Sequence, residues 1–230
     1  KGHNAWGVVT GKPLVLGGSL GRVEATGRGV MVSTRSALAK LGMKPTEVTC
    51  VVQGFGNVGS HAARLLSEKG VKIVGIGDQS ASYYNEMGID VASAIEWASK
   101  HNRNLKGFTG ATEIHHEELL ISKCDVLVPA ALQNVITEHN APHIQAKLIV
   151  EGANGPTSSD AEEILVNKGV LIIPDMYCNA GGVTVSYFEW LKNLSHVRYG
   201  RLEKRFTENA NSQIVKQMEQ MTAKISTIIF

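Results

Sequence analysis

The fold of this chain is decided by residues 51–59, which read Val51-Val52-Gln53-Gly54-Phe55-Gly56-Asn57-Val58-Gly59. An apolar, β-branched run over 48–52 leads into this stretch, and a helical pattern follows it over 57–69. A second apolar run over 71–76 ends at Asp78. A strand, a glycine turn, a helix, a second strand and an acidic residue within about 30 residues are typical of a dinucleotide-binding unit.

Each glycine of this stretch has a separate expected task. Gly54 permits the tight turn, Gly56 leaves the backbone open to a pyrophosphate, and Gly59 lets the helix pack closely on the strand. The first turn of the helix offers unpaired N–H groups and a partial positive charge to phosphates. Asp78 lies nineteen residues after Gly59 and is expected to accept hydrogen bonds from a ribose 2′-OH. The alternative is a glycine-rich turn in a βαβ unit of another kind.

The composition is that of an ordinary soluble globular protein, with 43% hydrophobic and 19% charged residues. A formal net charge of +2 gives no electrostatic case for nucleic acid or an anionic membrane. No apolar run reaches the roughly 18 residues of a transmembrane helix. Three widely spaced cysteines without a C-x-x-C pair indicate reduced thiols and a cytoplasmic location, an organellar one staying open. The histidines do not have zinc-ligand spacing, so no metal site is expected.

Further strands and helices are expected on either side of residues 48–78. Apolar runs at strand length recur at 124–129, 148–150 and 170–173, and helical patterns recur at 29–41, 90–101, 159–168 and from 182 onward. Residues 1–30, 79–89 and 102–116 are expected to be loops, and breaks are expected near Asn193 and Gly200. Strands that alternate with helices predict an α/β fold, a Rossmann-like, doubly wound, mostly parallel sheet with flanking helices.

We expect a single dinucleotide-binding domain over 1–230. It would comprise an N-terminal loop and helix (1–45), a Rossmann core (46–180) and C-terminal helices (181–230). The chain opens at Lys1 without an initiator Met and stops at Phe230 inside an apolar-periodic segment over 214–229. A helix normally ends with a cap or a glycine, so we expect this chain to be a piece of a longer protein.

Small or polar residues follow several of the predicted strands. Ala130-Ala131 follow one strand, residues 151–157 follow the next, and Pro174-Asp175 follow the last. Ligands of doubly wound sheets bind beyond the carboxyl ends of the strands, so these segments predict one continuous site. Within it, Asn154 and Asn179 are candidates to fix a carboxamide or a ribose hydroxyl.

Three further residues are candidates for ligand contacts. Arg22 can clamp a carboxylate through two parallel N–H bonds, or it can merely pin a loop. Thr26 can hydrogen-bond a cofactor amide. Ser186 can face a substrate, although spacing alone favours a serine that bonds back to its own helix.

No residue of the sequence is a compelling acid or base. Cys178 invites interpretation as a thiol nucleophile, but no neighbouring base or positive field activates it, so an inert, buried thiol is favoured. Hydride-transfer chemistry on an amine or alcohol also needs a proton-transferring group. None is apparent, and we therefore predict no catalytic residue in this chain.

Taken together, the motifs resemble the glutamate dehydrogenases of the Glu/Leu/Phe/Val amino-acid dehydrogenase family. The resemblance covers about residues 8 to 224. It rests on the joint occurrence, in this order, of Thr10-Gly11-Lys12-Pro13, Gly21-Arg22, Ala25-Thr26-Gly27-Arg28-Gly29, Gly54 to Gly59, Glu151 to Thr157, Asn179-Ala180-Gly181-Gly182-Val183 and Ser186-Tyr187-Phe188-Glu189-Trp190.

The resemblance implies an enzyme with a second domain. In the family, one domain binds the amino acid and supplies a catalytic lysine and aspartate, and a Rossmann-type domain binds the nicotinamide cofactor. This chain would be the Rossmann-type domain alone, with the N-terminal substrate domain absent, and would be inactive by itself. The implied reaction is oxidative deamination of L-glutamate to 2-oxoglutarate and ammonia by hydride transfer. The family commonly forms hexamers, which implies a homo-oligomer.

The resemblance also implies roles for single residues. Arg22 and Ser186 would touch the substrate, Ser186 at its side-chain carboxylate. The expected cofactor-binding residues are Thr26, Gly54, Phe55, Gly56, Asn57, Val58, Gly59, Asp78, Ala130, Ala131, Asn154 and Asn179.

The sequence leaves alternatives both for the cofactor that binds and for the class of protein. Asp78 would repel a 2′-phosphate, which favours NAD over NADP, although Lys72 or a rearranged loop over 79–84 could compensate. A non-catalytic dinucleotide-sensing module is a second possibility, against which the retention of Arg22, Asn179 and Ser186 counts. A thiol-dependent aldehyde dehydrogenase using Cys178 is a weaker one.

Overall fold

The computed structural model describes residues 6–195 of the 230. Contacts within the chain divide it into two compact units, Leu20–Ser186 and a unit made of Lys1–Ser19 and Tyr187–Phe230. The described part of the second unit is 6–19 and 187–195. Within 6–195, no helix combines the length and hydropathy that a membrane crossing requires. The predicted break near Gly200, the apolar segment over 214–229 and most of the predicted C-terminal helices lie outside the described residues.

The larger unit is built around a seven-stranded sheet with the strand order β4-β3-β2-β1-β5-β6-β7. The strands are β1 (Thr49–Gln53), β2 (Lys72–Gly77), β3 (Ser82–Tyr84), β4 (Thr112–Ile114), β5 (Val126–Pro129), β6 (Leu148–Val150) and β7 (Leu171–Ile173). The five strands from β2 through β1 to β7 run parallel, and β3 and β4 extend the sheet antiparallel beyond β2. The predicted α/β fold with a mostly parallel sheet is confirmed.

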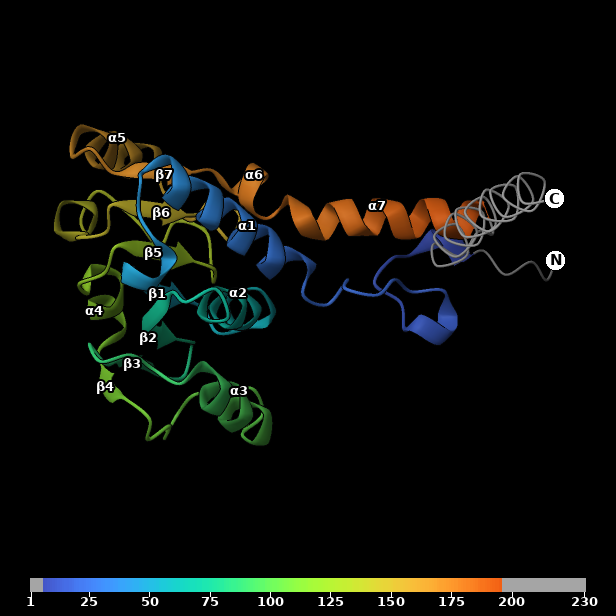
Figure 1. Cartoon of the computed structure of the whole chain (residues 1–230), viewed down its shortest axis with the longest axis horizontal. Helices are drawn as coiled ribbons and strands as arrows, with labels where there is room; N and C mark the ends of the chain where they lie inside the picture. Colours follow the sequence, from blue (N-terminus) through green and yellow to red (C-terminus); the bar gives the residue numbers. More distant parts are fainter. Residues whose placement is uncertain (1–5, 196–230) are drawn as a thin grey trace, which may run out of the picture. The chain divides into compact units, whose positions relative to one another are not determined.

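Helices cover both faces of this sheet (Figure 1). On one face pack α1 (Ala25–Lys40), α2 (Asn57–Ser67) and α3 (Val91–Lys100). On the other pack α4 (His116–Ile121), the 3₁₀ turn η4 (Ala141–His143) and α5 (Ser159–Asn167). The remaining described helices are α6 (Asp175–Cys178), α7 (Ala180–Leu194) and the 3₁₀ turns η1 (Trp6–Val8), η2 (Leu14–Leu16) and η3 (Pro45–Glu47).

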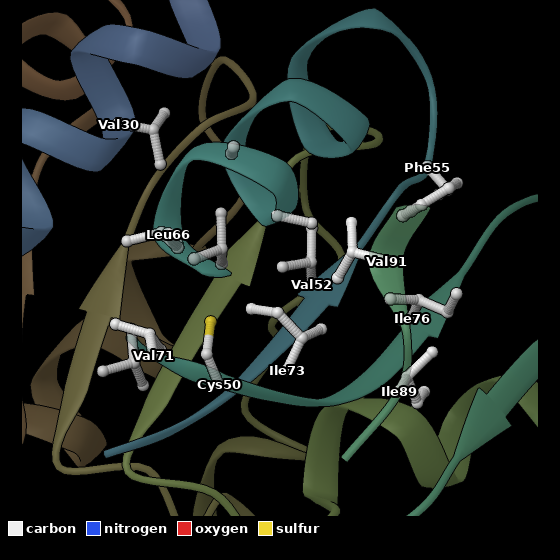
Figure 2. Packing of buried hydrophobic residues seen from close by; sticks show 14 of the residues in the cluster. Val30, Cys50, Val52, Phe55, Leu66, Val71, Ile73, Ile76, Ile89 and Val91 are labelled. Atoms are coloured by element: carbon white, nitrogen blue, oxygen red, sulfur yellow. The ribbon is translucent and has the colours of Figure 1, made fainter. Parts of the chain in front are cut away.

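The central strands send alternate side chains into two separate cores. Cys50 and Val52 of β1 lie in the core under α2 and α3, together with Ile73 of β2 (Figure 2). Val51 and Leu127 lie in the core on the opposite face. Because both faces are buried, these strands are apolar throughout, and the sequence shows them as continuous runs rather than as alternating patterns.

The strand order places a topological switch point between β1 and β5. The chain leaves β1 to form β2 on one side and later returns to form β5 on the other. Ligands of doubly wound folds bind at the carboxyl ends of the strands that flank such a point. The turn at Gly54 and the loop at Ala130 meet there, since Ala130 N donates to Gln53 O at 2.6 Å.

Most predicted core elements end within two residues of the observed ones, but some assignments are wrong. β3 and β4 lie in segments expected to be loops, because three-residue strands paired at an edge leave little local pattern. The short helix α4 is not predicted either. Helix α1 begins at Ala25, four residues before the expected start. The glycines expected to form a loop instead lie in α1, where they allow close packing. A Cβ on Gly27 would lie 2.8 Å from Ala62 N of α2.

In the smaller unit, a buried ion pair holds the segment 6–19 to the end of α7. Lys12 Nζ lies 2.7 Å from Glu189 Oε1, and Gly11 N donates to Glu189 Oε2 at 3.0 Å. The Glu189 side chain is 0% exposed. Burial alone would raise the pKa of Glu189, but Lys12 and the two backbone N–H groups outweigh burial, so the pKa lies below its ordinary value.

Replacing Lys12 with Met is expected to lower the free energy of unfolding by about 3 kcal/mol, because the Glu189 carboxylate stays buried without its counter-charge. Urea unfolding followed by tryptophan fluorescence measures this, since Trp6 and Trp190 belong to the same unit. Lys44, which pairs with Glu47 on the surface at 3.1 Å, supplies the control. Lys44→Met should change the free energy by less than about 0.5 kcal/mol.

The effect of Lys12→Met is also expected to depend on pH. A carboxyl whose pKa is lowered by folding stabilises the folded state above its unfolded value, here 4.5, and loses that contribution as the pH falls through the folded value. The difference between wild type and variant should therefore shrink as the pH falls from neutral through 4.5 and below it. A difference that stays constant over this range would contradict the assignment.

Candidate functional site

Gly54 and Gly59 occupy positions in which no side chain fits. Gly54 has a φ of +96°, and a Cβ there would lie 2.7 Å from the carbonyl carbon of Ala130. A Cβ on Gly59 would lie 1.7 Å from Gly54 O. Helix α2 therefore begins directly against the turn that ends β1, in the arrangement that the glycine spacing predicts.

Gly56 is a glycine for a different reason. A Cβ on Gly56 would meet no atom within 4 Å, and its φ of −78° is open to any residue. The fold therefore does not require a glycine here, and the space in front of the backbone is open. Gly56 is also the N-cap of α2 without a side-chain cap, which leaves first-turn N–H groups for an outside acceptor.

Two other residues of the turn direct their side chains elsewhere. Phe55 is 4% exposed and its ring lies in the core (Figure 2). The buried ring is compatible with the expected role of Phe55 in shaping the turn, and its part in cofactor binding stays a prediction. Asn57 Nδ2 donates to Val23 O at 3.0 Å, which ties the start of α2 to the loop before α1.

Asp78 follows β2 as expected, but its carboxylate already has four hydrogen bonds. Oδ1 accepts from Ser80 N and Ser80 Oγ, both at 2.6 Å, and from Ala81 N at 3.0 Å. Oδ2 accepts from Leu105 N at 2.7 Å. A carboxylate offers about four acceptor positions, so Asp78 chiefly shapes the loop that follows β2. A contact between Asp78 and a ribose stays a prediction.

A pocket of about 660 Å³ opens beyond the carboxyl ends of β1, β5 and β6. It is lined by Arg22, Thr26, Val58, Ala130, Ala131, Leu132, Gln133, Gly152, Ala153, Asn154, Asn179, Gly182, Val183 and Ser186. Eight of these are candidates from the sequence, whereas Gly54, Phe55, Gly56, Asn57, Gly59 and Asp78 do not line it. The other lining residues each lie within three positions of a predicted one, and that proximity in sequence was the available signal.

Arg22 and Ser186 meet at the wall of this pocket. Arg22 Nε donates to Ser186 Oγ at 2.8 Å, across 164 residues of sequence. The first turns of α1 and α7 approach closely enough for this contact, because a Cβ on Gly182 would lie only 2.3 Å from Thr26 Oγ1. The Ser186 hydroxyl that accepts from Arg22 keeps its own hydrogen to donate. A guanidinium beside a hydroxyl donor is suited to a carboxylate.

Asn154 and Asn179 also meet at the pocket wall. Asn179 Nδ2 donates to Asn154 Oδ1 at 2.7 Å. Among the described residues, no other partner is found for the Asn154 amide nitrogen or the Asn179 amide oxygen. The pair therefore presents one donor and one acceptor, the combination that a primary carboxamide complements.

Cys178 is not an activated nucleophile. It is 0% exposed, and its Sγ donates to Ile173 O at 3.2 Å. Burial raises the pKa of the thiol to about 12, against smaller opposing effects of hydrogen bonds. An inert thiol is therefore the correct interpretation. Over residues 6–195, no group of three or more His, Cys, Asp or Glu side chains is placed to hold a metal ion.

Replacing Asp78 with Ala is expected to lower the free energy of unfolding by about 2 to 4 kcal/mol, because three backbone N–H groups lose their acceptor. Thermal and urea unfolding measure this. Asp90 supplies the control, since its Oδ1 caps α3 by accepting from Ala92 N at 3.1 Å. Asp90→Ala should cost about 1 kcal/mol. An Asp78→Ala effect no larger than this would contradict the loop-shaping role.

Known proteins resemble this chain in sequence and in fold. The family described as Glutamate/Leucine/Phenylalanine/Valine dehydrogenase matches residues 17–228. A glutamate dehydrogenase of Thermotoga maritima is 50% identical over 194 residues, which cover 84% of this chain and 46% of the relative.

Solved structures agree with this match. The hetero-hexameric glutamate dehydrogenase of Thermus thermophilus, in a leucine-bound form, has a TM-score of 0.78 and 32% identity, over 87% of this chain and 48% of that one. The enzyme of Peptoniphilus asaccharolyticus has a TM-score of 0.70 and 35% identity, over 86% and 47%. The chain spans about half the length of these relatives. It belongs to the Glu/Leu/Phe/Val dehydrogenase family.

Proposed function

We propose that this chain is the cofactor-binding part of an NAD-dependent glutamate dehydrogenase. The observation that carries the proposal is the pocket at the switch point, which brings the Arg22–Ser186 pair and the Asn154–Asn179 pair to one wall. The whole enzyme would oxidatively deaminate L-glutamate to 2-oxoglutarate and ammonia. The family of the chain and its 50% identity to a glutamate dehydrogenase support this reaction.

The residues present fit a nicotinamide dinucleotide. The open space at Gly56 and the uncapped start of α2 suit a pyrophosphate, since a Cβ at Gly56 would fill that space. Asn154 and Asn179 would hold the carboxamide of the nicotinamide with their remaining donor and acceptor. When bound, the cofactor would accept a hydride from the α-carbon of the amino acid.

Arg22 and Ser186 would orient the amino acid. The guanidinium of Arg22 would bind a substrate carboxylate, and the Ser186 hydroxyl would donate a second hydrogen bond to the same group. A leucine or phenylalanine side chain offers no partner for these donors. A substrate with a side-chain carboxylate therefore fits this wall better than an apolar amino acid.

The preference for NAD rests on Asp78. Its carboxylate stands at the end of β2, where a negative charge opposes the 2′-phosphate of NADP. This repulsion depends only on the charge of Asp78 and does not require a free acceptor position on its carboxylate. NADP remains the alternative cofactor within the same proposal.

We also propose that the whole enzyme is a homo-oligomer. The hetero-hexameric relative of Thermus thermophilus supports oligomerisation, and the identity of the subunits is part of the proposal. Cys50, Cys124 and Cys178 are all unpaired and buried, which supports a reducing compartment such as the cytoplasm.

Replacing Gly56 with Val is expected to abolish dinucleotide binding while the chain stays folded. The new Cβ enters open space with no protein atom within 4 Å, and the side chain would block the approach of a pyrophosphate. Gly54→Ala is the contrasting variant: at a φ of +96° and 2.7 Å from Ala130, its Cβ should destabilise the fold itself. Circular dichroism and NADH titration of both variants separate the two effects. Wild-type affinity in Gly56→Val would contradict the proposed pyrophosphate site.

Calorimetric titration of the chain with NADH and, in parallel, with NADPH tests the proposal and the choice of cofactor. Tighter NADH binding is expected. Tighter NADPH binding would keep the dinucleotide site and overturn the assignment of Asp78. Absence of binding by either dinucleotide would contradict the proposed function.

The chain by itself is expected to bind the dinucleotide without oxidising L-glutamate. Among the described residues, no Lys, Asp, Glu or His lines the pocket, so no side chain there is ready to transfer a proton. NADH absorbance in the presence of NAD and L-glutamate measures turnover, with a full-length glutamate dehydrogenase as the positive control. Measurable turnover by the purified chain would show that a proton-transferring group has been overlooked.

A further inference from the structure

Two carboxylates behind the Asn154–Asn179 pair have no part in the function proposed above. Glu151 directly follows β6 and is 8% exposed. Asp175 follows β7 after Pro174, begins α6 and is partly buried. Neither residue lines the pocket, so neither can contact a ligand there directly.

Hydrogen bonds connect Glu151 to Asp175, and Asp175 to the loop that carries Asn154 and to the backbone of Asn179. Glu151 Oε2 accepts from Asp175 N at 3.0 Å. Asp175 Oδ2 accepts from Gly155 N at 2.8 Å, next to Asn154. Asp175 O accepts from Asn179 N, also at 2.8 Å, one helical turn further on. Asp175 is therefore bonded on one side to the loop that carries Asn154 and on the other to the backbone of Asn179.

The loop that carries Asn154 is held mainly by backbone hydrogen bonds on either side of Asn154. Asn154 and Gly155 are exposed, and Gly155 has a φ of +53° with no atom within 4 Å of a Cβ position. The loop is anchored before Asn154 by Ala153 N, which donates to Pro129 O at 2.9 Å. After Asn154 it is anchored by the Gly155 N bond to Asp175 and by Gly155 O, which accepts from Asn134 N at 2.8 Å. Without Asp175, the segment after Asn154 loses the bond that ties it to α6.

We propose that Asp175, placed by Glu151, is the positioning residue that fixes the Asn154–Asn179 pair in the geometry that receives the nicotinamide end of the cofactor. The inference rests on the proposed dinucleotide function and adds to it a residue outside the pocket. Asp175 acts through the two asparagines and does not touch the cofactor. Glu151 places Asp175 because its Oε2 accepts from Asp175 N, the first N–H of α6. Without this acceptor that N–H would be unpaired.

The experiment compares NADH with ADP-ribose, which has the same adenosine and pyrophosphate but no nicotinamide. Both are titrated calorimetrically into the full chain and into Asp175→Ala. The variant is expected to bind NADH about tenfold more weakly, the effect of about one lost hydrogen bond, and to bind ADP-ribose like the wild type. A loss confined to NADH is something that general destabilisation cannot produce.

Matched variants make the test sharper. Asp175→Asn keeps a carbonyl oxygen for Gly155 N and should recover most of the NADH affinity. Glu151→Gln keeps an acceptor for Asp175 N and should do the same, whereas Glu151→Ala should weaken NADH binding. Asp160 also stands in the first turn of a helix, α5, but is exposed. Asp160→Ala should leave both affinities unchanged.

The outcomes separate the two proposals. If the wild type binds neither ligand, the dinucleotide function fails and the positioning role falls with it. If the wild type binds both and Asp175→Ala keeps full NADH affinity, the dinucleotide function stands and the positioning role is overturned. An equal loss of NADH and ADP-ribose in Asp175→Ala also overturns it, because the aspartate would then support the whole site rather than its nicotinamide end.

Discussion

The close approach of helix α2 to the turn that ends β1 governs the arrangement of the whole site. A Cβ on Gly59 would lie 1.7 Å from Gly54 O, so the helix begins here only because that atom is missing. The positive φ of Gly54 turns the chain against Ala130 at the end of β5. As a result, the N-terminus of α2, with its positive end of the helix dipole, stands at the switch point of the sheet, where the loops after β5 and β6 also arrive.

The same constraint recurs where α1 meets its neighbours. A Cβ on Gly29 would lie 2.6 Å from Cys178 O, and a Cβ on Gly181 would lie 2.3 Å from Ala25 O. Backbones that approach this closely bring Arg22, just before α1, within 2.8 Å of Ser186 on α7. Gly56 is the exception, since no atom lies within 4 Å of a Cβ position there. These glycines thus separate into those that the fold requires and Gly56, for which the proposed pyrophosphate contact would be the reason.

The sequence predicted the features that are encoded locally and missed those that depend on distant partners. Buried parallel strands appear as apolar runs, so the central sheet was predictable, whereas β3 and β4 gain their order from pairing with β2 and with each other. The spacing of the motif predicted that Asp78 follows β2. One of its hydrogen-bond donors, Leu105 N, comes 27 residues later, so the hydrogen bonding of its carboxylate was not predictable. Phe55 lies in a polar-looking turn and is nevertheless core. The contact between Arg22 and Ser186 was not predicted, because 164 residues separate them; the family resemblance implied only that both would touch the substrate.

The acidic residues around the site share a physical task that explains the character of the pocket. Loops at the edge of a ligand site cannot be covered by packing, so their backbone N–H groups need other acceptors. Asp78, Glu151 and Asp175 each accept from such groups and are thereby held behind the wall rather than on it. Among the described lining residues Arg22 is then the charged side chain, beside amides, a threonine and a serine. Because these carboxylates accept from backbone N–H groups and do not line the pocket, the formal charge among the described lining residues is the positive charge of Arg22.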